Sequence, residues 1–281
     1  MKLNELRKTL KEMLEPSSAE DSAFEADCIV ADLLGCTNSA LRLLSETEVD
    51  DLTVEKAKAF VERRLAHEPL QYILGKWEFY GREFFVGDGV LIPRPETELL
   101  IDTAINELKD KTQPVCYDLC SGSGCIGITV SKEIPDSRVY MLEKSEKAFG
   151  YLEKNVAHNG AHNCKAVIGD IFEESPFEEK ADIILSNPPY ICSDVIPTLQ
   201  PEVHKEPIMA LDGGENGLVF YERIAYGWIN YLKPSGIIAV EIGEDQGESV
   251  STIFKEKFYD VSVIKDFSGN DRVVVARKLK N

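Results

Sequence analysis

The sequence predicts an α/β protein in which a mostly parallel sheet carries helices on both faces and a small helical bundle precedes the sheet. Two observations predict this fold. From Val115 onward, short apolar runs alternate with segments of helical periodicity, which is typical of a parallel sheet. Before about residue 70 the periodicity is helical throughout. A length of 281 residues allows one or two domains.

The N-terminal residues 1–74 are expected to form a helical domain. Leucines recur at helical spacing between residues 3 and 14, and an apolar face that ends at Gly35 predicts a second helix. Thr53 is expected to cap a longer helix that runs through Leu65.

Residues 75–95 are expected to form a linker with its own structure. Aromatic residues on both sides of Gly81 predict a β-hairpin with its turn at that glycine, and Gly87 begins a second turn. Pro95 then precedes a helical pattern. The α/β domain is therefore expected to span residues 96–281.

Seven strands are expected in this α/β domain. They lie at 115–119, 138–142, 166–168, 181–186, 236–242, 258–264 and 272–276. A helix over 216–232 is expected to separate the fourth strand from the fifth. Because only a short loop separates the last two strands, the last strand should be antiparallel. The sequence thus predicts a Rossmann-like, seven-stranded sheet that differs from all-parallel dinucleotide folds.

Charge and composition exclude several classes of function. The chain has 31 Lys plus Arg against 49 Asp plus Glu, a formal net charge of −18. Direct DNA binding is not expected, because binding to duplex phosphates needs basic patches. The seven cysteines and four histidines show no ligand spacing for a metal. With no apolar signal core and no stretch of membrane-spanning length, the protein is expected to be cytoplasmic.

The segment Ser186-Asn187-Pro188-Pro189-Tyr190 follows an apolar strand, so it lies at a carboxyl edge, where open α/β sheets bind ligands. Two prolines remove backbone donors, and the corner then offers mainly acceptors: the Asn187 side-chain oxygen and the carbonyls of Asn187 and Pro188. These suit a planar –NH2 group, with Tyr190 over its flat face. Two acceptors favour the pyramidal nitrogen whose lone pair points at an electrophile, and this stabilises a transition state for transfer to nitrogen.

The turn from Cys120 to Gly124 joins the first strand to a helix, and its glycines allow close approach of backbone to a ligand. Gly127 completes the spacing of dinucleotide sites, so the glycines alone do not select the cofactor. The discriminator is Asp170 after the third strand together with Asn-Pro-Pro-Tyr after the fourth. Three acids contribute to the site: one below the loop, one at the ribose position and one near the adenine amine. They are Asp118, Glu143 and Asp170. These acids favour a cationic sulfonium nucleoside, which predicts S-adenosylmethionine.

A wider set of motifs extends along most of the chain. They are Tyr72-Ile-Leu-Gly75, Trp77-Glu-Phe-Tyr-Gly81, Leu91-Ile-Pro-Arg-Pro-Glu-Thr-Glu98, Asp118-Leu-Cys-Ser-Gly-Ser-Gly124, Ser186-Asn-Pro-Pro-Tyr190, Glu206-Pro-Ile-Met-Ala-Leu211, Gly213-Gly-Glu-Asn-Gly217 and Glu241-Ile-Gly243. With this set the chain resembles the HemK/PrmC family. Its members are S-adenosylmethionine-dependent methyltransferases that modify the glutamine of the Gly-Gly-Gln motif in class I peptide chain release factors.

The resemblance implies roles for individual residues. The implied cofactor contacts are Asp118, Cys120, Ser121, Gly122, Ser123, Gly124, Glu143, Asp170, Ile171 and Asn187. The implied substrate contacts are Asn187, Pro188, Pro189 and Tyr190, with Arg94 at the border of the pocket; Asn187, Pro188 and Tyr190 are the implied catalytic residues. The chain departs from the usual family pattern at Cys120, where glycine is usual, at Glu143, where aspartate is usual, and at Ile171, where an aromatic residue is common.

The resulting hypothesis is direct transfer of a methyl group to the glutamine nitrogen, with S-adenosylhomocysteine as the product and the helical domain binding the release factor. Two alternatives stay open at this point. An adenine-N6 DNA methyltransferase shares the Asn-Pro-Pro-Tyr motif, although it would need a flipped base and a basic groove. A non-catalytic S-adenosylmethionine-binding partner of release factors or ribosomes is the other.

Overall fold

The computed structural model describes residues 1–17 and 21–280. It contains two compact units. One comprises Met1–Lys76 with Gln200–Lys205, and the other comprises Trp77–Leu199 with the chain from Glu206 onward. In neither stretch that the model describes is a helix both long enough and apolar enough to cross a membrane.

The first unit is helical. Its helices are α1 (Leu3–Leu14), α2 (Ser22–Leu34), α3 (Asp51–Leu65) and α4 (Leu70–Leu74), with a 3₁₀ turn at Asn38–Arg42. The leucines of α1 that recur at helical spacing are fully buried. The expected cap at Thr53 was wrong: Asp50 is the N-cap of α3, and its carboxylate accepts hydrogen bonds from the Thr53 N–H at 2.9 Å and hydroxyl at 2.8 Å. Aspartate is the stronger N-cap residue of the two.

The hairpin consists of β1 (Lys76–Phe79) and β2 (Arg82–Phe85). Tyr80 and Gly81 have φ angles of 52° and 68°, as a two-residue turn between twisted strands requires. This confirms the predicted turn. The ring of Phe84 is buried in the core of the α/β unit, and the Phe85 backbone exchanges two hydrogen bonds with the side chain of Asn155.

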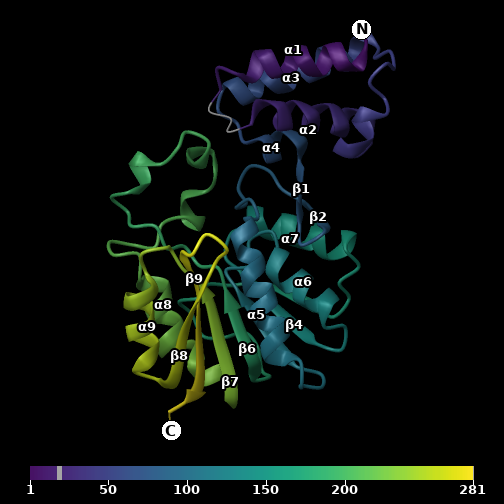
Figure 1. Ribbon diagram of the computed structural model, residues 1–281. Helices are drawn as coiled ribbons and strands as arrows, with labels where there is room; N and C mark the ends of the chain where they lie inside the picture. Colours follow the sequence, from purple (N-terminus) through teal and green to yellow (C-terminus); the bar gives the residue numbers. More distant parts are fainter. Residues whose placement is uncertain (18–20, 281) are drawn as a thin grey trace. The chain divides into compact units, whose positions relative to one another are not determined.

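The α/β unit is built on one seven-stranded sheet (Figure 1). Its strands are β3 (Val115–Leu119), β4 (Arg138–Glu143), β5 (Cys164–Ile168), β6 (Ala181–Ser186), β7 (Leu232–Glu241), β8 (Phe258–Lys265) and β9 (Asp271–Leu279). They lie in the order β5-β4-β3-β6-β7-β9-β8. The pairs from β5 to β7 are parallel, whereas β9 is antiparallel to both β7 and β8. The predicted sheet and its antiparallel last strand are confirmed.

Helices cover both faces of the sheet. On one face α5 (Glu98–Leu108), α6 (Cys125–Glu133) and α7 (Glu146–His158) bury residues such as Leu100, Ile128 and Leu152. On the other face lie α8 (Val219–Tyr226) and α9 (Gly247–Lys255). Further 3₁₀ turns occur at Pro95–Thr97, Ile196–Thr198, Val203–Lys205, Ile208–Ala210 and Trp228–Tyr231.

The expected helix over 216–232 was too long at both ends. Gly217 has a φ of 70°, which is left-handed, so α8 begins only at Val219. The helix ends at Tyr226. The buried Trp228 then turns the chain by donating its indole N–H to the Ile171 carbonyl at 2.9 Å, and β7 begins at Leu232.

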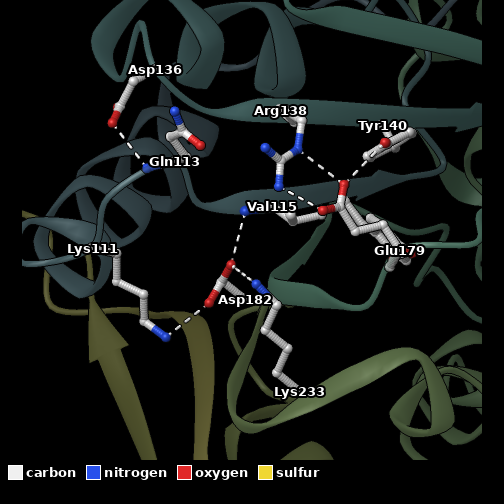
Figure 2. Close-up of polar contacts among 10 residues, drawn as sticks. Lys111, Gln113, Val115, Asp136, Arg138, Tyr140, Glu179, Asp182 and Lys233 are labelled. Atoms are coloured by element: carbon white, nitrogen blue, oxygen red, sulfur yellow. Dashed lines mark hydrogen bonds and ion pairs between the residues drawn. The ribbon is translucent and has the colours of Figure 1, made fainter.

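The amino edge of the sheet is held together by ion pairs and backbone hydrogen bonds (Figure 2). Asp182, at the start of β6, accepts from the Val115 N–H at 2.9 Å and from the ammonium groups of Lys111 at 3.0 Å and Lys233 at 2.6 Å. This edge is opposite to the carboxyl ends of the parallel strands, so it serves stability and leaves those carboxyl ends free to bind ligands.

Candidate active site

A cavity of about 360 Å³ lies at the carboxyl edge of the sheet, within the size range of small-molecule sites. Most of the residues predicted from sequence line it: Arg94, Cys120, Ser121, Gly122, Ser123, Glu143, Asp170, Ile171, Asn187 and Pro189. The lining does not include four of the predicted residues, Asp118, Gly124, Pro188 and Tyr190. The loops after β3, β4, β5 and β6 therefore meet at one cavity, as their positions after parallel strands require.

The loop after β3 turns sharply through left-handed backbone. Cys120, Gly122 and Gly124 have φ angles of 60°, 55° and 80°, and the Gly124 N–H donates to the Ser121 carbonyl at 2.8 Å. A Cβ on Gly122 would meet no atom within 4 Å, so this glycine faces open space at the cavity. Glycine is therefore needed at 122 for its backbone conformation and for close approach of a ligand, since no neighbouring side chain fills that space.

Glu143 anchors this loop to the end of β4. Its Oε2 accepts from the Gly122 N–H at 2.8 Å and its Oε1 from the Ser145 N–H at 2.7 Å. Burial raises the pKa of this carboxyl, although the two backbone donors oppose that effect. Each carboxylate oxygen retains a second lone pair, so Glu143 can still accept hydrogen bonds from a diol in the cavity.

Asp170 and Ile171 follow β5 at the opposite wall. Partial burial opposes ionisation of Asp170, but the ammonium of Lys144 at 2.7 Å and the Phe172 N–H lower the pKa of its carboxyl. Lys144, Phe172 and Phe220 also line the cavity, and sequence reasoning did not find them. The two rings pack edge to face with centroids 5.3 Å apart, so the cavity has aromatic lining next to Ile171.

Asp118 lies beneath the glycine loop and does not reach the cavity. It is fully buried, and its Oδ2 accepts from the Gly127 N–H at 2.9 Å, whereas its Oδ1 has no hydrogen-bond partner among the described residues. Burial raises the pKa of Asp118 to about 7. A Cβ on Gly127 would stand 2.5 Å from the Met141 sulfur, so the third glycine allows α6 to pack closely on the sheet.

The corner after β6 presents Asn187 to the cavity. Its Nδ2 donates to the Thr97 hydroxyl at 3.2 Å, and this hydroxyl donates to the Glu241 carboxylate at 2.6 Å. Pro188 and Pro189 are buried. The Tyr190 carbonyl accepts from Gln246 at 3.0 Å, and burial raises the pKa of the Tyr190 phenol to about 12.

Sequence reasoning assigned no role to Thr97, Glu241 or Gln246. One signal was available for Glu241, because a carboxylate at the carboxyl end of an apolar strand faces the ligand edge of such a sheet. Thr97 lies within the motif Leu91-Ile-Pro-Arg-Pro-Glu-Thr-Glu98, but no local pattern indicates what its hydroxyl contacts.

Arg94 borders the cavity with its charge already paired. Its guanidinium contacts the carboxylate of Glu206, which is buried and also accepts from the Ile92 N–H at 3.0 Å. Glu206 therefore joins the segment before α5 to the segment that carries Pro207 and Met209, which also line the cavity. This ion pair stiffens the rim of the cavity.

Comparisons with known proteins agree with this geometry. Residues 5–75 match the family model described as PrmC N-terminal domain, and residues 95–228 match Methyltransferase small domain. The release factor glutamine methyltransferase of Thermodesulfovibrio yellowstonii is 43% identical over 84% of this chain and 86% of its own length. The chain belongs to the release factor glutamine methyltransferase family. The member from Aquifex aeolicus is 36% identical over 99% of this chain and 98% of its own length.

The release factor glutamine methyltransferase family is the one that the motifs in the sequence indicate, and that resemblance is confirmed. Among solved structures, the hMettl16 catalytic domain in complex with MAT2A 3'UTR hairpin 6 has a TM-score of 0.59 and 14% identity, and the match covers 83% of this chain and 84% of that one. At this identity the likeness concerns the fold alone. It confirms the methyltransferase fold of the α/β unit.

Proposed function

We propose that this protein transfers a methyl group from S-adenosylmethionine to the side-chain nitrogen of the glutamine in the Gly-Gly-Gln motif of class I release factors, in the cytoplasm. Membership of the release factor glutamine methyltransferase family supports the reaction. The observation that carries the proposal is the position of Asn187 at the cavity, with its side-chain N–H groups turned toward Thr97. Its amide oxygen is then the atom available to a donor in the cavity.

The residues of the cavity fit S-adenosylmethionine, which supplies an electrophilic methyl group when bound. Gly122 allows backbone to approach the ligand, and Glu143 keeps a lone pair on each oxygen for ribose hydroxyls. Asp170, whose carboxyl has a lowered pKa and lines the cavity, is proposed to accept a hydrogen bond from the adenine amine. The charged side chains of the lining balance: Asp88, Glu143 and Asp170 are acidic, and Arg94, Lys144 and Lys147 are basic.

The corner after β6 is proposed to activate the substrate amide. A glutamine nitrogen is a poor nucleophile because its lone pair is delocalised. The Asn187 oxygen and the Pro188 carbonyl are acceptors that hold its two hydrogens and favour the pyramidal form as the new bond develops. With a pKa of about 12, Tyr190 remains a neutral phenol. It is not among the residues that line the cavity in this structure, and its proposed contact with the amide plane is made once the substrate is bound. Most of the rate acceleration comes from positioning.

The helical domain, residues 1–74 by the sequence prediction, is proposed to bind the release factor, and residues 75–95 to connect it to the catalytic domain, residues 96–281. Direct binding to DNA is not part of the proposal. The formal net charge of −18 opposes association with duplex phosphates.

Methyl transfer tests this proposal. A class I release factor is incubated with the protein and S-adenosylmethionine, and its intact mass is measured. We expect a gain of one methyl group that is lost with Asn187→Ala and retained with Asn230→Ala, a change at an exposed asparagine whose side-chain amide donates to the Gly227 carbonyl. No gain with the wild-type protein, with cofactor binding verified by calorimetry, would refute the proposed substrate.

A further inference from the structure

Asn187 can orient a substrate amide only if its own amide is held one way round. The two ends of an asparagine side chain have the same shape, and hydrogen-bond partners alone decide which end carries the oxygen. If the amide were reversed, Asn187 would present N–H donors to the –NH2 group of the substrate. Such a corner would repel the substrate nitrogen, so the orientation of this one amide is a condition of the proposed function.

The partners of Asn187 impose a direction on the hydrogen bonds. The Thr97 hydroxyl has one proton, and it lies 2.6 Å from Oε2 of Glu241. An ionised carboxylate can only accept, so the hydroxyl must donate to it. The hydroxyl oxygen then has lone pairs alone for Asn187, 3.2 Å away. Only the Nδ2 end of Asn187 can satisfy those lone pairs.

Thr97 and Glu241, which continue the hydrogen bonds from Asn187, are buried and held by further backbone hydrogen bonds. Thr97 and Glu241 are 2% and 1% exposed, so water does not compete for their hydrogen bonds. Thr97 stands at the end of the 3₁₀ turn Pro95–Thr97, and its N–H donates to the Arg94 carbonyl at 3.1 Å. Glu241 is the last residue of β7, and its backbone carbonyl accepts from the Tyr221 hydroxyl at 2.9 Å.

We infer that Thr97 and Glu241 are positioning residues that fix the orientation of the Asn187 amide, and that Glu241 does so through the direction of the Thr97 hydroxyl. This inference rests on the proposed function. A buried carboxylate is costly, and a role in directing the hydroxyl gives a reason for its presence at the end of a core strand.

Protonation of Glu241 should remove this constraint on the Asn187 amide and make kcat depend on pH. When Glu241 takes up a proton it can itself donate, so the Thr97 hydroxyl is free to donate toward Asn187 and both amide orientations become compatible. Burial raises the pKa of Glu241 to about 7, so kcat should fall as the pH drops through that range. The charged and titratable groups that face Glu241 are Arg272, Glu96, Arg94, Tyr190, Tyr221 and Cys125.

Steady-state kinetics with matched variants test the inference. Thr97→Val keeps the volume and removes the hydroxyl, and we expect kcat to fall about 10- to 100-fold with an unchanged Kd for S-adenosylmethionine. Thr97→Ser restores most of the rate. Thr103→Val is the control, because Thr103 is buried on α5 and its hydroxyl donates only to the Leu99 carbonyl; its kcat should equal that of the wild type.

Two further readouts separate positioning from a merely structural role. In an Asn187→Ala background, Thr97→Val should cause no further loss of kcat, because the residue through which it acts is gone. The side-chain ¹⁵N resonance of Asn187 should shift with Thr97→Val, and its pH titration should disappear with Glu241→Gln.

Several outcomes would overturn the inference: a kcat for Thr97→Val within about twofold of the wild type, an equal further loss in the Asn187→Ala background, or an Asn187 resonance that ignores both changes. In each of these outcomes the wild-type protein still methylates the release factor, so only the inference about Thr97 and Glu241 fails. The proposed function fails separately, when the wild-type protein itself does not methylate the release factor.

Discussion

A substitution at Gly122 can distinguish two roles of this glycine, its left-handed backbone conformation and the close approach of the ligand. In Gly122→Ala the new Cβ meets no protein atom within 4 Å, and the residue keeps a φ of 55°. The left-handed conformation alone should cost about 1 kcal/mol of unfolding free energy. Gly160 is the matched control in the same unit: its φ is 58°, a Cβ added there would approach a His162 nitrogen at 3.8 Å, and it does not line the cavity.

Both variants should therefore lose about 1 kcal/mol in denaturant unfolding. Only Gly122→Ala places a methyl group against the ligand, and we expect its Kd for S-adenosylmethionine to rise at least about tenfold, equivalent to about 1.4 kcal/mol. Calorimetric titration of each variant measures this difference. Equal cofactor affinity in the two variants would refute the assignment of Gly122 as the point of closest approach.

Glu143→Gln should raise the Kd for S-adenosylmethionine about tenfold, because an amide must direct –NH2 toward one of two backbone donors; an unchanged Kd in calorimetry would contradict the ribose assignment. Tyr190→Phe should keep most of the activity, and the wild-type rate should show no loss from phenol ionisation up to about pH 10, because the pKa of Tyr190 is about 12; an alkaline limb near pH 10 that vanishes in Tyr190→Phe would show the reverse. Asp182→Asn should lower the unfolding free energy by about 1 to 3 kcal/mol at neutral pH with unchanged cofactor affinity. Burial opposes ionisation of Asp182, but hydrogen bonds from Lys233, the Val115 N–H and Lys111 lower the pKa of its carboxyl. Its contribution to stability is therefore present above its unfolded pKa of 3.8 and is lost as the pH falls through its folded pKa. If Asp182→Asn still lowered the unfolding free energy below that pH, this reasoning would be contradicted.

The positions of the strands along the chain could be predicted in large part because the signals are local. Buried parallel strands such as β3 and β6 read as continuous apolar runs. The strand β5 begins at Cys164, two residues before its predicted start, because it lies at the edge of the sheet, is only partly buried and carries a weaker pattern. Thr53 was wrongly expected to be the N-cap of α3 because Asp50, three residues earlier, can cap the same helix. Which of the two caps the helix depends on side-chain geometry.

Some residues of the candidate site could likewise be placed from local sequence, whereas others could not. Asn187 directly follows the apolar strand β6, and Gly122 stands in the short turn after the apolar strand β3, so topology alone places them at one edge. The contact between Thr97 and Glu241 joins residues 144 positions apart, and nothing in their local sequence pairs them. Asp118 sits in the right motif, yet its depth beneath the loop emerges only from the packing of α6 through Gly127.

The most direct test of the central claim is the fragment-ion mass spectrum of a class I release factor after incubation with this protein and S-adenosylmethionine, with DNA present as a competing acceptor. The account predicts a single methyl group on the side-chain amide nitrogen of the Gly-Gly-Gln glutamine and none on DNA. A methyl group on another residue of the release factor, or on adenine alone, would contradict the role given to the corner at Asn187.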